Sequence, residues 1–235
     1  MSEPLDKIVN QAREALGDNL QSIVLYGSHA RSDAGPHSDY NLLIVVKDYT
    51  PGRLAPLRAH AQAWLKLRVV PPVIMQADQM PRSLDTFALE FLEMAAARTV
   101  LFGGDPFADF APDWNTVRSE LEREARQKRI SLVRRWLAAG GDAKIIKALI
   151  ADTVPSYFTL LRCTLMLKRR EVLSLTTDAV FAELSGKPWF KPDVWSRLRA
   201  TVTGQTKLSK TELEALIPEY IQQAMALVHR LDELE

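Results

Sequence analysis

The stretch that decides the fold runs from Ser22 to Val46 and reads SIVLYGSHARSDAGPHSDYNLLIVV. Two apolar runs enclose a polar loop, which begins with Gly27-Ser28 and ends with Ser38-Asp39-Tyr40-Asn41. Short runs rich in β-branched residues, separated by a segment rich in glycine, proline and serine, predict two strands of one sheet, Gln21 to Tyr26 and Asn41 to Val46. The loop therefore gathers polar side chains at one edge of a sheet.

A Gly-Ser turn followed by an arginine brings anion-binding groups to one place. Glycine lets backbone N–H groups approach a phosphate, Ser28 adds a hydroxyl, and Arg31 adds a cation. The second strand delivers Asp39 to the same edge, and Mg²⁺ prefers carboxylate oxygens. The loop thus suits a nucleoside triphosphate and its metal. The structural alternatives are a tight turn without a ligand and an Asp39 that only caps its loop.

Helical and extended patterns flank these two strands. The pair Pro71-Pro72 indicates either an edge strand or the start of a strand, since proline cannot donate to a strand ladder. The remaining elements follow from apolar periodicity. They are a helix over Pro4 to Leu16, a helix over Pro51 to Leu67 with Leu54, Leu57, Ala61, Trp64 and Leu65 inward, a strand at Val73 to Gln76, a helix capped by Ser83 with Phe87, Phe91, Leu92 and Ala95 inward, and a strand at Thr99 to Phe102.

Strand patterns stop beyond Thr116, and the rest of the chain is expected to be helical. Gly103-Gly104-Asp105-Pro106 breaks the chain just before this change. The helices are expected at Val117 to Ala138 with Leu121, Ala125, Ile130, Val133 and Leu137 inward, at Ala143 to Lys168, at Thr177 to Leu184, at Pro192 to Val202, and from a capping box at Ser209 and Glu212 to about Glu233. The predicted class is α+β: a small mixed sheet with flanking helices in residues 1–112, then an all-α bundle in residues 113–235.

The overall composition excludes several classes of partner. The 235 residues carry a net charge of +1, so no global field attracts nucleic acid or an anionic membrane. Arginines of the helix from Val117 to Ala138 are interleaved with glutamates, which favours an ordinary solvated face over an RNA surface. The single cysteine, Cys163, fits a reducing compartment. We therefore expect a cytoplasmic protein with no membrane and no nucleic-acid partner.

The motif from Gly27 to Arg31, followed by Ser38-Asp39-Tyr40-Asn41-Leu42, resembles the signature of the polymerase-beta-like nucleotidyltransferase superfamily. The resemblance covers roughly the first hundred residues, and the helical remainder resembles the bundle that accompanies minimal nucleotidyltransferase domains. It implies a nucleotide site formed by Gly27, Ser28, Arg31 and Ser38, with ATP as the expected triphosphate and Mg²⁺ held by Asp39. The resemblance also puts His29 and His37 beside the site.

This sequence departs from the family pattern at the carboxylates. Asn41 stands where the signature has a second aspartate, and the strand region from Val69 to Met75 lacks the third carboxylate of active members. Asp78, just beyond that strand, is the substitute that the sequence offers. Asp39 and Asn41 thus occupy the catalytic positions of a degenerate site.

Three functions remain open. The first is a pseudoenzyme that binds a nucleoside triphosphate with weak or lost catalysis and acts in sensing or regulation. The second is an active Mg²⁺-dependent nucleotidyltransferase that modifies a hydroxyl of a small molecule or protein, with the bundle forming part of the acceptor cleft. The third is a non-enzymatic interaction module with a vestigial turn, in which the apolar bundle forms a homodimer. The sequence does not specify the acceptor.

Overall fold

The computed structural model describes residues 3–35 and 38–234, which divide into two compact units. The first unit extends to Asp113 and also includes Val172–Ser174; the second contains Trp114–Glu171 and the residues from Leu175 onward. The short segment joins the first unit because Val172 packs against its core. The domain limits 1–112 and 113–235 stay a proposal, since a compact unit need not fold alone.

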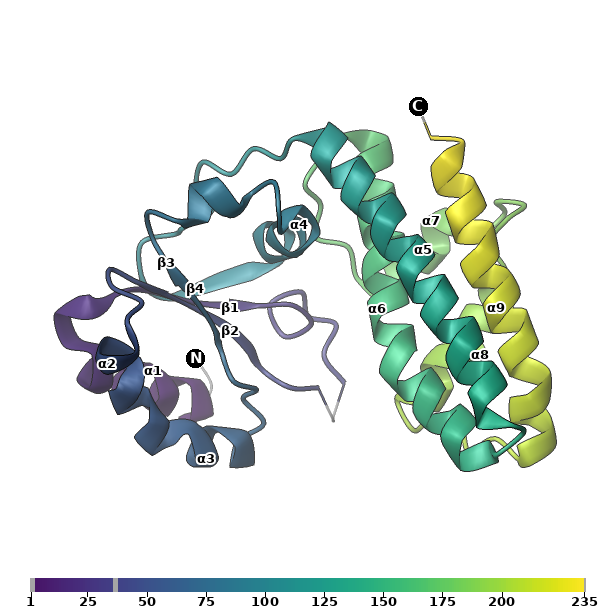
Figure 1. Ribbon diagram of the computed structural model, residues 1–235, viewed down its shortest axis with the longest axis horizontal. Helices are drawn as coiled ribbons and strands as arrows, with labels where there is room; N and C mark the ends of the chain where they lie inside the picture. The colour runs from purple at the N-terminus through teal and green to yellow at the C-terminus, as the bar shows by residue number, and fades with distance from the viewer. Residues whose placement is uncertain (1–2, 36–37, 235) are drawn as a thin grey trace. The chain divides into compact units, whose positions relative to one another are not determined.

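The first unit is built on a mixed four-stranded sheet with the strand order β3-β2-β1-β4 (Figure 1). The central strand β1 is antiparallel to both β2 and β4, and β2 is parallel to β3. Tyr26, at the end of β1, pairs with Asn41 of β2 and Arg98 of β4. The polar loop between β1 and β2 therefore lies at this end of the strands. The edge position that Pro71-Pro72 allows for β3 is confirmed. The strand bounds are β1 Leu20–Tyr26, β2 Asn41–Val46, β3 Val73–Gln76 and β4 Arg98–Gly103.

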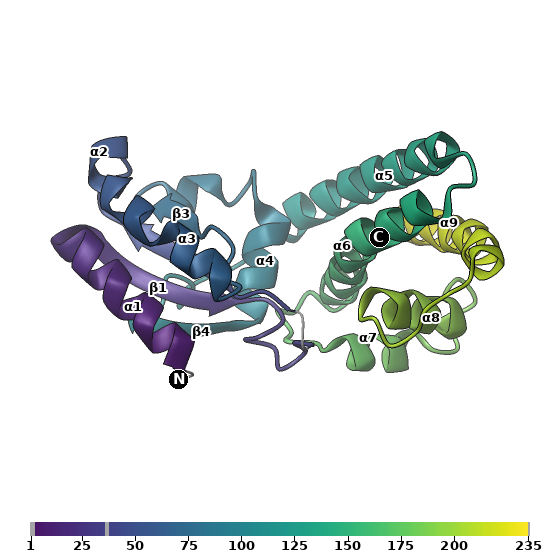
Figure 2. The same cartoon turned by 90° about the horizontal axis from the view of Figure 1, so that it is seen from below.

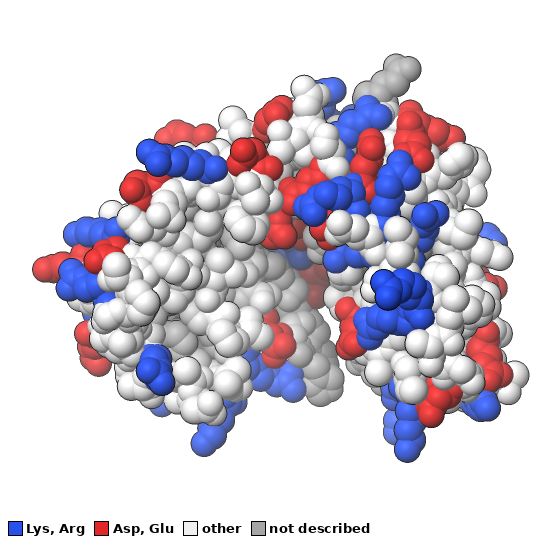
Figure 3. Space-filling view, viewed as in Figure 1, with Lys and Arg blue, Asp and Glu red and all other residues white. Residues whose placement is uncertain are grey.

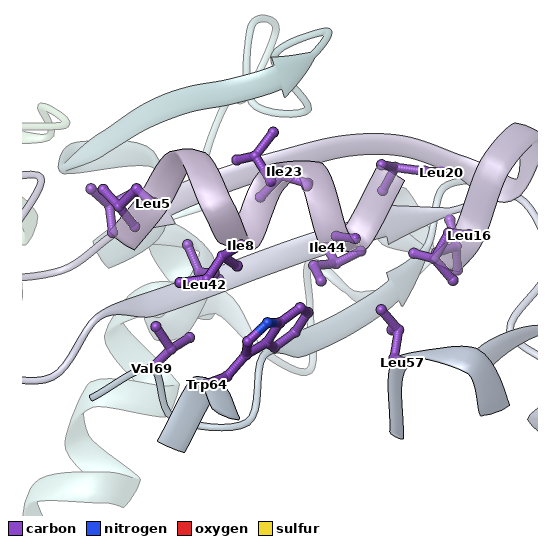
Figure 4. Close-up of a cluster of buried hydrophobic side chains, with 14 residues drawn as sticks. Leu5, Ile8, Leu16, Leu20, Ile23, Leu42, Ile44, Leu57, Trp64 and Val69 are labelled. Atoms are coloured by element: carbon purple, nitrogen blue, oxygen red, sulfur yellow. The ribbon is translucent and has the colours of Figure 1, made fainter. Parts of the chain in front are cut away.

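One face of the sheet is covered by α1 (Glu3–Leu16) and α3 (Arg58–Lys66). Figure 4 shows α1 lying over the strands, with Ile8, Ile44 and Trp64 in one cluster of buried side chains. The Trp64 indole N–H donates to the Gln11 side chain at 2.9 Å and so ties α3 to α1. The predicted helix from Pro4 to Leu16 is thus confirmed, and Trp64 is a core residue.

The opposite face is covered by α4 (Ala88–Ala96). Successive strand residues point to opposite faces, and Val24, Leu43 and Val45 share their core with α4. The same alternation puts Tyr26 and Asn41 on the α4 face. The position of α4 therefore decides what surrounds the polar loop.

Two predicted helices begin or run differently from the sequence expectation. The helix expected over Pro51 to Leu67 is divided into α2 (Pro51–Leu54), the 3₁₀ turn η2 (Ala55–Leu57) and α3, which shifts the inward face and leaves Ala61 and Leu65 exposed. Ser83 does not cap α4. It closes the 3₁₀ turn η3 (Met80–Ser83), its hydroxyl donates to the Gln79 carbonyl at 3.0 Å, and α4 begins later, with Phe87 45% exposed.

The second unit is an all-α bundle (Figures 1 and 2). α5 packs on α6 and α9, and α6 also packs on α7 and α8. An Asp142 cap begins α6, and the Ser209–Glu212 capping box begins α9 as predicted. No helix in the described part of the chain is long and apolar enough to cross a bilayer. The bounds are α5 Trp114–Ala139, α6 Ala143–Arg169, α7 Thr177–Leu184, α8 Pro192–Val202 and α9 Lys210–Asp232.

The inward face predicted for α5 is wrong at two positions. Ile130 is 50% exposed and Leu137 is 66% exposed. The buried stripe follows Val117, Leu121, Ala125, Leu132 and Ala139, which lie on one side at steps of four and seven residues. Apolar residues occur on both the buried and the exposed side of α5, so their spacing alone is compatible with two different inward faces.

Candidate nucleotide site

Residues 27–32, called the Gly-Ser turn from here on, form a hydrogen-bonded turn directly after β1. The Arg31 N–H donates to the Gly27 carbonyl at 3.0 Å, and the Asp33 N–H donates to the Ser28 carbonyl at 2.9 Å. Gly27 has a φ of +78° and Ser32 a φ of +58°. Positive φ is strained for most residues, which explains glycine at the start of the turn.

Three consecutive N–H groups at the start of this turn remain available. Residues 3–35 and 38–234 contain no hydrogen-bond acceptor for the backbone N–H groups of Ser28, His29 and Ala30. Successive backbone N–H groups in a turn can form a concavity that binds anions. Ser28 and its neighbours are half-buried, so a phosphate can reach them. The turn thus has the geometry of a phosphate cradle.

Asn41 lies directly against this turn. A Cβ placed on Gly27 would come within 3.1 Å of the Asn41 amide nitrogen, so any larger residue at Gly27 would push this side chain. Because Asn41 also pairs with Tyr26 across the strands, its position is fixed by the sheet. The structure therefore brings together two of the residues predicted for the site.

His29 links the Gly-Ser turn to the segment that carries Asp39. Its Nε2 lies 3.2 Å from the Ser38 carbonyl, and since a carbonyl only accepts, the imidazole donates. Its ring also stacks on Tyr40, with the ring centroids 3.9 Å apart and an interplanar angle of 18°. These two contacts flank Asp39 on both sides in the sequence. The second histidine predicted here, His37, lies outside the described residues.

The remaining predicted residues differ in how they are engaged. The Asp39 side chain is exposed. The Ser38 hydroxyl accepts from the Gly35 N–H at 2.9 Å, so it closes its own loop. Arg31 is buried: its side chain is 5% exposed and its Nη1 lies 3.5 Å from a carboxylate oxygen of Glu93 on α4.

Two further groups near the turn were missed from the sequence. Glu93 stands in the apolar run ALEFLEMAA of α4, and an acid within such a run was the available signal that a cation lies opposite. Tyr26, the last residue of β1, is half-buried. Burial and, to a smaller extent, the charge of Glu90 raise the pKa of its phenol, which therefore stays neutral at physiological pH.

Asp39 and Asn41 are the residues of the motif that fit one Mg²⁺ ion. Asp39 supplies one carboxylate and Asn41 one amide oxygen, and an aspartate with an asparagine holds Mg²⁺ in kinases when phosphate oxygens complete the shell. In the part of the chain that the structure describes, no group of three or more histidine, cysteine, aspartate or glutamate side chains is arranged to hold a metal.

Asp78 is not a substitute for the missing carboxylate. β2 and β3 are parallel and Val46 pairs with Gln76, so Asp78 follows the far end of β3. Asp39 precedes the near end of β2. The two carboxylates therefore lie beyond opposite ends of the strands, since the register separates Asp39 from Gln76 by about seven strand residues, or roughly 23 Å.

Several arginines of α5 form ion pairs with nearby carboxylates. Ion pairs join Arg118 to Glu122, Arg126 to Asp232 and Arg135 to Asp152. On the face shown in Figure 3, acidic and basic side chains lie next to one another. A shallow groove of about 410 Å³ on α5, lined by Gln127, Ile130, Ser131, Arg134, Arg135 and Ala138, contains none of the predicted site residues.

Comparison with known proteins gives three findings. Residues 5–96 match the protein family described as "Nucleotidyltransferase domain". A protein of Methanocaldococcus jannaschii, provisionally named a protein adenylyltransferase, is 38% identical over 50 residues, which are 21% of this chain and 34% of that relative. The aligned stretch thus spans about a third of the relative's length.

The third finding is a similar solved structure. The spectinomycin adenyltransferase AAD(9) from Enterococcus faecialis, crystallised with ATP and spectinomycin, has a TM-score of 0.60 over 95% of this chain and 98% of its own. Its sequence identity is 14%, so this likeness shows the fold alone. It does show that the fold extends over both the sheet and the helical region.

Proposed function

Because the chain carries a nucleotidyltransferase domain of the polymerase-beta-like superfamily, we propose that it binds a nucleoside triphosphate at the Gly-Ser turn and transfers the nucleoside monophosphate to a hydroxyl group. The observation that carries the proposal is the set of available N–H groups of Ser28, His29 and Ala30 beside Asn41 and the segment of Asp39. Backbone donors for phosphate oxygens and the proposed metal ligands thus lie at the same end of the strands.

The proposed transfer is an in-line displacement at the α-phosphorus. The acceptor hydroxyl oxygen forms a bond to the α-phosphorus, the bond from that phosphorus to the bridging oxygen breaks, pyrophosphate leaves, and the hydroxyl proton is released to solvent. The turn holds the phosphates that become pyrophosphate. Asp39 and Asn41 are the residues that would hold Mg²⁺ together with phosphate oxygens, and the ion would neutralise phosphate charge.

We propose ATP as the triphosphate and AMP as the group transferred. The support is that both similar proteins described above are named as adenylyltransferases and that one was crystallised with ATP. For the acceptor, the fold similarity over both units favours a small molecule, and spectinomycin is the first to try. A protein hydroxyl is the second choice, favoured by the 38% identity over 50 residues.

Binding without transfer is the second candidate function. The specific observation in its favour is that Asp39 is the one carboxylate at the two positions of the family motif on β2, since Asn41 occupies the other, and that β3 supplies none. The comparisons show no loss of catalysis. Transfer therefore stands first, and the experiment below decides between the two.

Two measurements test the proposal in sequence. Calorimetric titration with ATP and Mg²⁺ is expected to show binding, and the absence of heat at millimolar ATP would contradict the phosphate cradle. ATP labelled at the α-phosphate is then incubated with the protein and with spectinomycin, other aminocyclitols or a cell extract, with EDTA as the control. Labelled acceptor that disappears with EDTA supports transfer, whereas binding without any labelled product favours the second candidate.

A further inference from the structure

Glu93 is an acid held inside an otherwise apolar helix and aimed at the Gly-Ser turn. Its neighbours Leu92 and Met94 are buried in the core, and its own side chain is 13% exposed. Its carboxylate lies 3.5 Å from the Arg31 guanidinium, whose side chain is 5% exposed. A carboxylate and a guanidinium this far from solvent neutralise each other's charge. Removing the carboxylate would leave the guanidinium buried without that opposite charge.

The same turn of α4 contacts the Gly-Ser turn a second time. The Ala97 carbonyl, four residues after Glu93, accepts from the Gly27 N–H at 3.2 Å. The Ala97 N–H in turn donates to the Glu93 carbonyl at 3.2 Å. The end of α4 thus holds both the first residue of the turn, through Ala97, and the Arg31 side chain, through Glu93.

We propose that Glu93 is a positioning residue for nucleotide binding. It keeps the Arg31 side chain against α4, so that Arg31 braces the turn from behind while the N–H groups of Ser28, His29 and Ala30 face the phosphates. This inference rests on the proposed nucleotide-binding function of the turn. It assigns the triphosphate contact to the backbone and gives the buried cation a supporting role.

The direction in which removal of the Glu93 carboxylate changes ATP affinity distinguishes a positioning role from simple charge repulsion. A carboxylate near an anion site repels the triphosphate, so its removal by itself strengthens binding. A positioning carboxylate does the opposite, because its loss releases the cation that braces the turn. Glu90 is the matched control, since it lies one turn earlier on α4, carries the same charge, is exposed, and is close enough to Tyr26 to influence its phenol.

The experiment compares Glu93→Gln with Glu90→Gln in the full chain. ATP affinity is measured by calorimetry, and hydrogen exchange is followed at the Arg31 and Asp33 amides, which form the internal bonds of the turn. Glu93→Gln is expected to weaken ATP binding about tenfold and to speed exchange at both amides. Glu90→Gln is expected to leave exchange unchanged and to keep or strengthen ATP binding.

Each outcome decides the inference. Unchanged or tighter ATP binding in Glu93→Gln, with unchanged exchange, overturns it. If wild type binds no ATP, the proposed function fails, and the exchange measurement still decides whether Glu93 holds the turn. If Glu93→Gln does not fold, Glu93→Asp replaces it, with a shorter side chain that keeps the charge. A folded Glu93→Asp with wild-type affinity and exchange also overturns the inference.

Discussion

The two halves of the candidate site are built by different means. The Gly-Ser turn is anchored to the core, since its first residue bonds to the end of α4 and its Arg31 side chain lies buried against Glu93. The segment of Asp39 is attached through His29, and the Asp39 carboxylate itself is exposed. A change in the turn is therefore expected to affect stability, whereas a change of a carboxylate is not.

This difference accounts for the composition of the site. Substituting a residue that packs in the core lowers stability as well as function, whereas substituting an exposed carboxylate affects function and has little effect on stability. The phosphate-binding half can thus stay complete while the metal-binding half carries one carboxylate and Asn41. The predictions below separate the two halves, from the largest expected effect to the smallest.

Asp39→Ala is expected to lower nucleotidyl transfer at least about 100-fold, because a metal ligand supplies several kcal/mol of charge stabilisation. Its thermal midpoint is expected to match wild type, since the side chain is exposed. Transfer assays and thermal unfolding measure both. Asp78→Ala, beyond the opposite end of the strands, is the control and should leave transfer unchanged; an equal loss in both variants would contradict the assignment of Asp39.

Gly27→Ala is expected to weaken ATP binding about tenfold and to cost about 1–2 kcal/mol of unfolding free energy, because alanine is strained at positive φ and its Cβ would push Asn41. Calorimetry and denaturant unfolding measure the two effects. Gly52→Ala, in the exposed helix α2 with open space around it, is the control and should be neutral or stabilising. A Gly27→Ala protein with wild-type stability would remove the contrast between the two halves.

Asn41→Asp is expected to raise Mg²⁺-dependent transfer about tenfold, since a second carboxylate strengthens metal binding at the same edge. The fold should survive, because Asn41 is only partly buried. Transfer is measured against Mg²⁺ concentration, with Asn10→Asp on the exposed face of α1 as the control for the same chemical change. Loss of folding in Asn41→Asp would show that the amide has a structural role against Gly27.

Asp105 gives the smallest effect and tests the support of the turn from β4. Hydrogen bonds from Arg98, which is paired with Tyr26 in the sheet, hold the pKa of the Asp105 carboxyl below its usual value. A lowered pKa stabilises the fold above the unfolded carboxyl pKa, and this contribution of about 1 kcal/mol is lost as pH falls through the folded pKa.

The corresponding measurement is unfolding free energy between pH 7 and pH 3. Asp105→Asn is expected to be about 1 kcal/mol less stable than wild type at pH 7, and the gap should close toward pH 3. The exposed Asp109 in the same loop provides the control, Asp109→Asn, which should keep the wild-type profile. A gap that persists at low pH would mean that the ion pair is not its cause.

Much of the fold could be predicted from the sequence because particular residues favour one local geometry. Gly27 needs positive φ, Pro71-Pro72 limits β3, and the Ser209–Glu212 capping box marks the start of α9. The local errors arose where two readings compete. Ser83 served a 3₁₀ turn instead of a helix cap, and α5 carries apolar residues such as Ile130 on its outer side.

The sequence predicted only part of the candidate site. The motif predicted that Gly27, Asn41 and the segment of Asp39 lie together, because they belong to two adjacent strands. The pairing of Arg31 with Glu93 joins residues 62 positions apart, and no local pattern reports such a contact. Asp78 was misplaced for a related reason, since the direction of β3 relative to β2 is decided by the chain crossover and not by the strand sequence.

A crystal structure with Mg²⁺ and a non-hydrolysable ATP analogue tests the central claim most directly. The account predicts triphosphate oxygens within hydrogen-bond distance of the Ser28, His29 and Ala30 N–H groups, a metal ion on Asp39, and Arg31 still paired with Glu93. A triphosphate bound away from residues 27–32, or no nucleotide at millimolar concentration, would contradict it.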